Sequence, residues 1–62
     1  MTETEIMDAA YADALKALFK VMQASYVIAN GDPQAEKHAD EAFKAGAANT
    51  RKLRARALVL LT

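Results

Sequence analysis

The chain has 62 residues, with eight basic and eight acidic side chains, no cysteine and one histidine. A chain of this length can form one domain with a thin core, because about 60 residues bury only about 60% of the surface that the unfolded form exposes. Disulfides are excluded, one histidine cannot build a zinc site, and a formal net charge of zero gives no overall attraction to nucleic acid or to an acidic membrane.

A first helix is predicted from about residue 3 to residue 29. Thr2 is suited to cap it, with Glu5 three residues later as in a capping box, and acidic residues in the first turn complement the helix dipole. Neither glycine nor proline interrupts this stretch, and alanine dominates its apolar residues, which favours helix. The sequence therefore predicts one long uninterrupted rod.

A turn is predicted at residues 30–32, and a second helix from residue 33 to about residue 61. Asn30 and Gly31 tolerate the positive φ angles found after helix ends, Asp32 is a suitable N-cap, and Pro33 fits the first helical position. A connection this short implies antiparallel neighbours. The predicted fold class is all-α, a two-helix antiparallel hairpin that forms one domain over residues 1–62.

The longest apolar run, from Ala57 to Leu61, is far shorter than the roughly 20 residues that a membrane span requires. The sequence also begins with acidic residues, whereas a signal peptide begins with basic ones. We therefore expect no membrane span and a cytoplasmic location.

The first helix has two apolar faces when it is placed on a helical wheel. The smaller side chains form one set, here called the small set: Ile6, Ala10, Ala17, Val21, Ala24 and Ile28. The larger side chains form the bulky set: Tyr11, Leu15, Leu18, Phe19, Met22 and Tyr26. The apolar stripe of the second helix is only about 100° wide and can cover one of these sets. An apolar surface without a partner indicates an interface.

Small residues of the second helix recur at helical spacing: Ala35, Ala39, Ala42 and Gly46. A glycine inside a helix costs about 1 kcal/mol relative to alanine, and close approach of the two backbones would compensate for it. We therefore expect this stripe to pack on the small set. The bulky set would then meet a second copy in a dimeric four-helix bundle, or a different protein as a heterologous partner.

Two groups of basic residues are candidates for contact with RNA or DNA. One is the run that contains Arg51, Lys52, Arg54 and Arg56, and the other is Lys16 and Lys20 with Phe19 between them. An antiparallel hairpin is expected to bring the run beside four acidic residues, Glu3, Glu5, Asp8 and Asp13. It is also expected to bring Lys16 and Lys20 alongside Asp40 and Glu41. Such pairing would fix the register and weaken phosphate binding, which needs free positive charge.

No group of residues predicts catalysis. His38 falls on the polar side of the second helix, and Ser25 has no histidine or acid close to it in the sequence. The hydroxyls of Ser25 and Thr50 are expected to bond to the carbonyls four residues earlier. We predict no enzymatic activity, no cofactor and no metal. The favoured function is a small self-associating interaction or assembly protein, and the alternative is a dimeric nucleic-acid-binding regulator.

Overall fold

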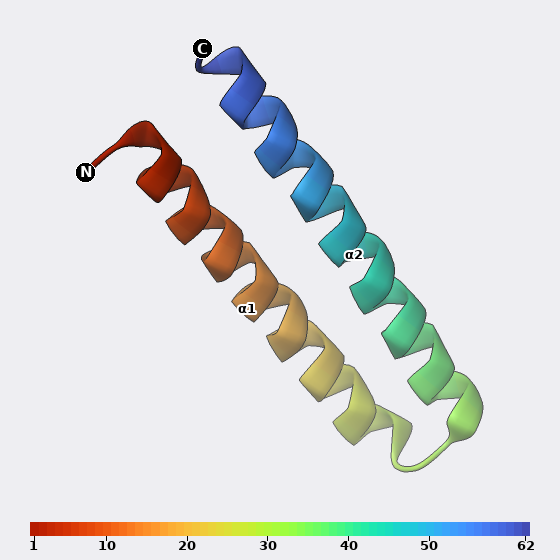
Figure 1. Cartoon of the computed structure of the whole chain (residues 1–62). Helices are drawn as coiled ribbons and strands as arrows, with labels where there is room; N and C mark the ends of the chain where they lie inside the picture. The colour runs from red at the N-terminus through yellow and green to blue at the C-terminus, as the bar shows by residue number, and fades with distance from the viewer.

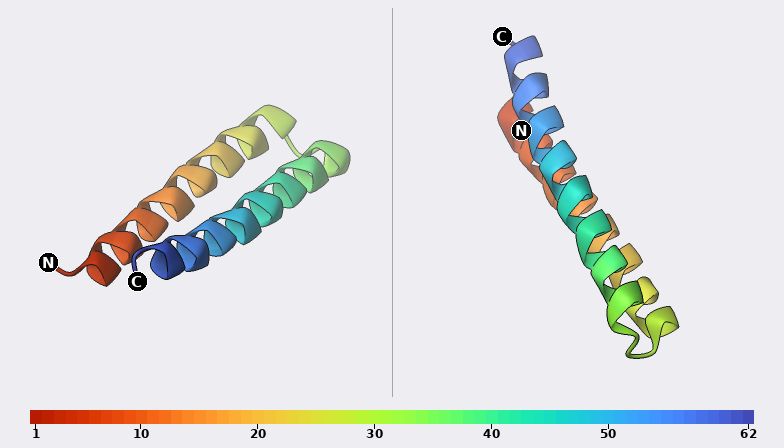
Figure 2. Two further views of the ribbon diagram at one scale, coloured as in Figure 1. Left: turned by 90° about the horizontal axis from the view of Figure 1, so that it is seen from above. Right: turned by 90° about the vertical axis from the view of Figure 1, so that its right-hand side faces the viewer.

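The computed structural model describes all 62 residues as two antiparallel helices, α1 (Glu3–Ala29) and α2 (Pro33–Leu60). They lie side by side along their whole length, and both termini lie at the end opposite the turn (Figures 1 and 2). The Cα atoms extend over 46 × 18 × 8 Å. The hairpin is therefore a thin slab with two broad faces, and the predicted helix bounds are confirmed to within one residue.

The caps follow from local sequence. The side chain of Thr2 accepts a hydrogen bond from the Glu5 backbone N–H at 3.1 Å, and Asp32 accepts one from the Gln34 N–H at 3.1 Å. Each bond satisfies one of the backbone donors left free at a helix start. Pro33 follows Asp32 at the start of α2, where its missing N–H costs nothing.

The turn uses left-handed backbone conformations. Asn30 has φ of 49° and Gly31 has φ of 84°, a region that asparagine and glycine tolerate better than other residues. The Asn30 N–H donates to the Tyr26 carbonyl at 3.2 Å, and the Asp32 N–H donates to the Ala29 carbonyl at 3.0 Å. The chain reverses within three residues, as predicted.

On α1 the seam is formed by four members of the bulky set, Tyr11, Leu15, Leu18 and Met22, so the prediction that the small set packs on α2 is wrong. Leu18 lies against Gly46, where a methyl group in place of the glycine hydrogen would sit only 2.6 Å from Leu18 Cδ2. Leu15, Met22 and Tyr11 are half-buried in the same seam. The glycine is paired with a large side chain rather than with another small one, so its missing methyl makes room for leucine.

The hairpin buries little. Its only buried residues are Ala29 at 9% exposure and Ala39 and Ala47 at 7% each, and no large side chain is fully buried. Two rods in contact along one line can shield only the atoms between them. Even the leucines of the seam therefore keep part of their surface in water.

Candidate functional site

The two broad faces of the slab carry different side chains. Leu18 lies against Gly46, and the helices are antiparallel, so each residue after Leu18 in α1 lies beside a residue the same number of positions before Gly46 in α2. This register shows which residues of the two helices are at the same height along the seam. We call one face the aliphatic face; its members are Ile6, Ala10, Ala17, Val21, Ala24 and Ile28 of α1 with Ala35, Ala42, Leu53 and Leu60 of α2. The opposite one, here the aromatic face, carries Phe19, Tyr26 and Phe43.

The aliphatic face exposes most of the large aliphatic side chains. Val21 is 65% exposed and Ile28 83%, while Leu53 and Leu60 are 60% and 69% exposed. Between Glu3 and the end of α1, no charged residue belongs to this face. The α1 half of this face is the small set. These residues lie outside the seam, because Tyr11, Leu15, Leu18 and Met22 occupy the seam. The unpartnered apolar surface predicted from the sequence is therefore present, on the other side of α1.

Two grooves run along the seam on the aliphatic face. The groove nearer the turn has a volume of about 480 Å³ and is bordered largely by small side chains: Ser25, Ala29, Ala35, Ala39 and Ala42, with Ile28, Asp32 and His38. The groove nearer the termini, of about 280 Å³, has Leu53 on its border together with Met7 and Ala10. The end nearer the turn thus has the larger groove, lined mainly by small side chains, and the end nearer the termini has the smaller groove with the exposed side chains of Leu53 and Leu60.

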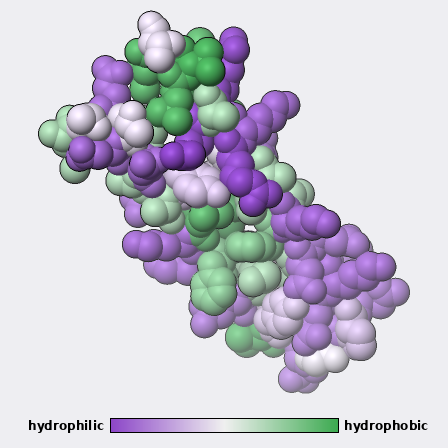
Figure 3. All heavy atoms as spheres, viewed as in Figure 1, coloured by the Kyte–Doolittle hydropathy of each residue, from purple (hydrophilic) through white to green (hydrophobic).

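The aromatic face is crossed by polar contacts within the chain. Arg54 donates to Oδ1 of Asp8 from Nε at 2.9 Å and also from Nη2, and its guanidinium carbon lies 5.5 Å from the centroid of the Tyr11 ring. Tyr26 donates a hydrogen bond to Asp40. Figure 3 views the hairpin from this side, where hydrophilic residues separate the hydrophobic ones. Arg54, Asp8, Tyr26 and Asp40 are thus already partnered within the chain.

The hydrogen bond between Tyr26 and Asp40 changes the acidity of the phenol. The carboxylate of Asp40 accepts the phenolic hydrogen, and partial loss of hydration and the negative charges of Asp40 and Glu36 act in the same direction. Together they raise the pKa of Tyr26 to about 12. This contact was not predicted from the sequence; the register could have suggested it, because Tyr26 and Asp40 lie almost level across the seam.

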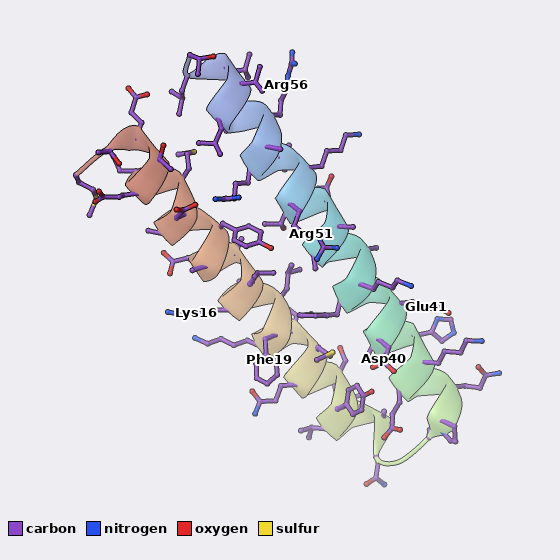
Figure 4. All side chains as sticks on the ribbon, in the orientation of Figure 1. Lys16, Phe19, Asp40, Glu41, Arg51 and Arg56 are labelled. Atoms are coloured by element: carbon purple, nitrogen blue, oxygen red, sulfur yellow. The ribbon has the colours of Figure 1, made fainter.

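The predicted charge pairing is largely wrong. Arg54 with Asp8 is the only ion pair, and its side chains are 37% and 52% exposed. Lys16 points away from α2, and Glu41 lies on the side of α2 away from α1 (Figure 4). The pairing of Lys16 and Lys20 with Asp40 and Glu41 fails because Lys16 and Lys20 lie level with Ala48 and Lys44, further along α2 than the acids.

The basic run does not form a single patch. Arg51 and Arg56 are five residues apart, which turns their side chains about 140° from one another on a helix. Arg54 is engaged by Asp8, and Lys52, four residues before Arg56, lies on the same side of α2 as Arg56. The run is therefore divided: Lys52 and Arg56 share one side of α2, while Arg51 and the paired Arg54 lie on other sides.

Lys16, Phe19 and Lys20 remain together on α1. Phe19 is 52% exposed, and it borders a shallow groove of about 480 Å³ with both lysines, Gln23 and two side chains of the seam, Leu15 and Phe43. Neither lysine takes part in an ion pair. This is the one place where an exposed aromatic ring lies between free positive charges.

The two hydroxyl candidates bond within their own helices. The Ser25 hydroxyl donates to the Val21 carbonyl at 2.9 Å and the Thr50 hydroxyl to the Gly46 carbonyl at 2.8 Å, which confirms both predictions. His38 borders the groove nearer the turn, and no three His, Cys, Asp or Glu side chains converge. Neither helix has a stretch with the length and hydropathy needed to span a bilayer.

No protein-family model matches the sequence, and neither a curated protein nor a solved structure resembles it significantly.

Proposed function

We propose that this chain is a small self-associating protein in which two hairpins pack face to face as a four-helix bundle. The observation that supports this most strongly is the absence of any fully buried large side chain in the isolated hairpin. Hydrophobic burial is the main favourable term in folding, and three buried alanines supply very little of it. A second hairpin would cover the half-buried seam and supply the missing core.

The role that follows is assembly or interaction rather than catalysis. The second hairpin would cover one broad face of the slab and the edge of the seam that borders it, and the outer faces would remain available for other molecules. The sequence predicted the bulky set at the dimer interface and away from α2, whereas Leu15, Leu18 and Met22 lie in the seam with α2. Phe19 and Tyr26 would keep their place on the aromatic face.

Sedimentation equilibrium of the purified chain tests this function directly. We expect a mass of twice 6.7 kDa at micromolar concentration, and a melting temperature that rises with protein concentration because association stabilises the folded form. A cooperatively folded species of 6.7 kDa with a melting temperature independent of concentration would refute self-association. An unfolded chain that becomes helical only when a different protein is added would instead identify a heterologous partner.

A second candidate function, binding of single-stranded nucleic acid, is favoured by the cluster of Lys16, Phe19 and Lys20. Exposed aromatic rings stack on bases, and neighbouring lysines contact phosphates. We would titrate a fluorescent oligouridine at about 50 and about 200 mM salt and compare K16A/K20A with K37A/K44A, which removes the same charge from α2. Salt-sensitive binding lost only in K16A/K20A would support this function, and equal loss in both variants would argue against it.

A further inference from the structure

The aliphatic face of α1 has a symmetrical sequence pattern. Ala10 and Ala24 are each seven residues from Ala17, and Ile6 and Ile28 are each eleven residues from it. Seven residues are close to two helical turns and eleven close to three, so all five lie along one line of the helix. Reversing the direction of α1 about Ala17 therefore places alanine on alanine and isoleucine on isoleucine.

Two oppositely charged residues beside this line lie at nearly equal distances from Ala17. Asp13 is four residues before Ala17 and Lys20 is three residues after it, and both lie on the outer flank of the line. In an antiparallel pair of α1 helices centred on Ala17, Asp13 of each copy lies within one residue of the level of Lys20 of the other. Neither Asp13 nor Lys20 has an ion-pair partner within its own chain. A second copy would give two such pairs.

Large and small side chains of α2 lie at nearly equal distances on either side of the residue level with Ala17. Ala17 lies level with Ala47, because Leu18 lies against Gly46. Leu53 is six residues after Ala47 and Ala42 is five before it, while Leu60 is thirteen after and Ala35 is twelve before. Turning one copy end for end brings the protruding leucines of its terminal end over the hollow, alanine-lined groove of the other copy.

We propose that a second copy of this chain covers the aliphatic face in antiparallel orientation, with the two turns at opposite ends and a two-fold axis crossing at the level of Ala17 and Ala47. The slab measures 46 × 18 Å, about 830 Å² in projection, and a standard interface buries about 800 Å² on each partner. This inference rests on the proposed self-association. It adds which face of the hairpin meets the second copy, the relative direction of the two hairpins and the residues at the centre of the interface.

Disulfide cross-linking tests the arrangement, and the absence of native cysteine makes the result unambiguous. Helix axes about 8 to 10 Å apart place facing Cα atoms within disulfide range. We expect Ala17→Cys to form a covalent dimer on mild oxidation, and Ala10→Cys alone to form none. A mixture of Ala10→Cys and Ala24→Cys chains should form mixed dimers.

Other outcomes would overturn the inference separately from the proposed function. Self-linking of Ala10→Cys would place the two-fold axis near residue 10 and overturn the register, and efficient linking through Phe19→Cys in place of Ala17→Cys would indicate the aromatic face. In either case self-association would stand. A monomer in sedimentation would remove both proposals.

Substitutions that need no oxidation provide an independent test. Val21→Glu, on the aliphatic face, should raise the dissociation constant of the dimer at least tenfold, whereas Val27→Glu, on the outside of α1, should leave it within about twofold. Asp13→Lys should weaken the dimer about tenfold at low salt, and the exchanged pair Asp13→Lys with Lys20→Asp should restore it. Equal effects of the two valine substitutions, or no rescue by the exchange, would contradict the proposed register.

Discussion

Replacing Gly46 by alanine tests whether Leu18 determines the packing of the seam. Alanine gains about 1 kcal/mol over glycine in a helix interior, so the substitution would stabilise an unconstrained α2. Here the new methyl would lie 2.6 Å from Cδ2 and 3.2 Å from Cδ1 of Leu18. Overpacking of this kind costs about 1 to 3 kcal/mol, so we expect a net loss of about 0 to 2 kcal/mol.

A double-mutant cycle separates the two effects. In a Leu18→Ala background the space opposite Gly46 is open, so Gly46→Ala should there stabilise the protein by about 1 kcal/mol. The coupling between the two sites should be about 1 to 3 kcal/mol, measured by urea denaturation at one fixed protein concentration because association contributes to stability. If Gly46→Ala has the same effect in both backgrounds, Leu18 does not pack on Gly46 and the helices meet along a different seam.

Three further predictions concern single polar groups. Asp32→Ala should lower stability by about 1 kcal/mol, with Asp32→Asn close to wild type in a thermal melt, because asparagine can also cap. Tyr26→Phe should lower the free energy of unfolding below about pH 10, and this loss should shrink as the pH rises toward about 12, since the raised pKa of Tyr26 means that folding favours the protonated phenol. Chemical denaturation of both proteins from about pH 8 to about pH 12 measures the difference in stability, and a difference that does not change with pH would contradict the prediction. Asp8→Asn should cost no more than about 1 kcal/mol, because its pair with Arg54 is exposed.

The hairpin itself could be predicted because its signals are local. The residues around the turn fix where α1 ends and α2 begins, and the Thr2 cap fixes the start of α1. Each of these depends on hydrogen bonds between residues no more than four apart, so no tertiary information is needed. The same holds for the hydroxyls of Ser25 and Thr50.

The side of α1 that faces α2 could not be predicted by matching small residues with small residues. A single glycine at position 46 admits one leucine, and a seam of large side chains against alanines buries more apolar area than a seam of alanines on both sides. The charges misled for a related reason. Opposite charges at the same end of a hairpin pair only when their helical angles also agree, as those of Asp8 and Arg54 do.

A helix with two apolar faces can pack on its neighbour in the chain through either face, and a helical wheel does not show which face it uses. Symmetry of the sequence, taken together with exposure, helps to decide which face packs on a second copy of the chain. Packing of α1 on α2 joins different sequences and requires no symmetry in either, whereas packing of α1 on its own copy requires the same residues to suit both sides of the axis. Both sets contain matched residues: the bulky set pairs Tyr11 with Tyr26, Leu15 with Met22 and Leu18 with Phe19 about the midpoint of residues 18 and 19, and the small set pairs Ala10 with Ala24 and Ile6 with Ile28 about Ala17. The small set is the one left exposed, because Tyr11, Leu15, Leu18 and Met22 lie in the seam. Symmetry together with exposure therefore favours the aliphatic face as the one that a second copy of the chain covers.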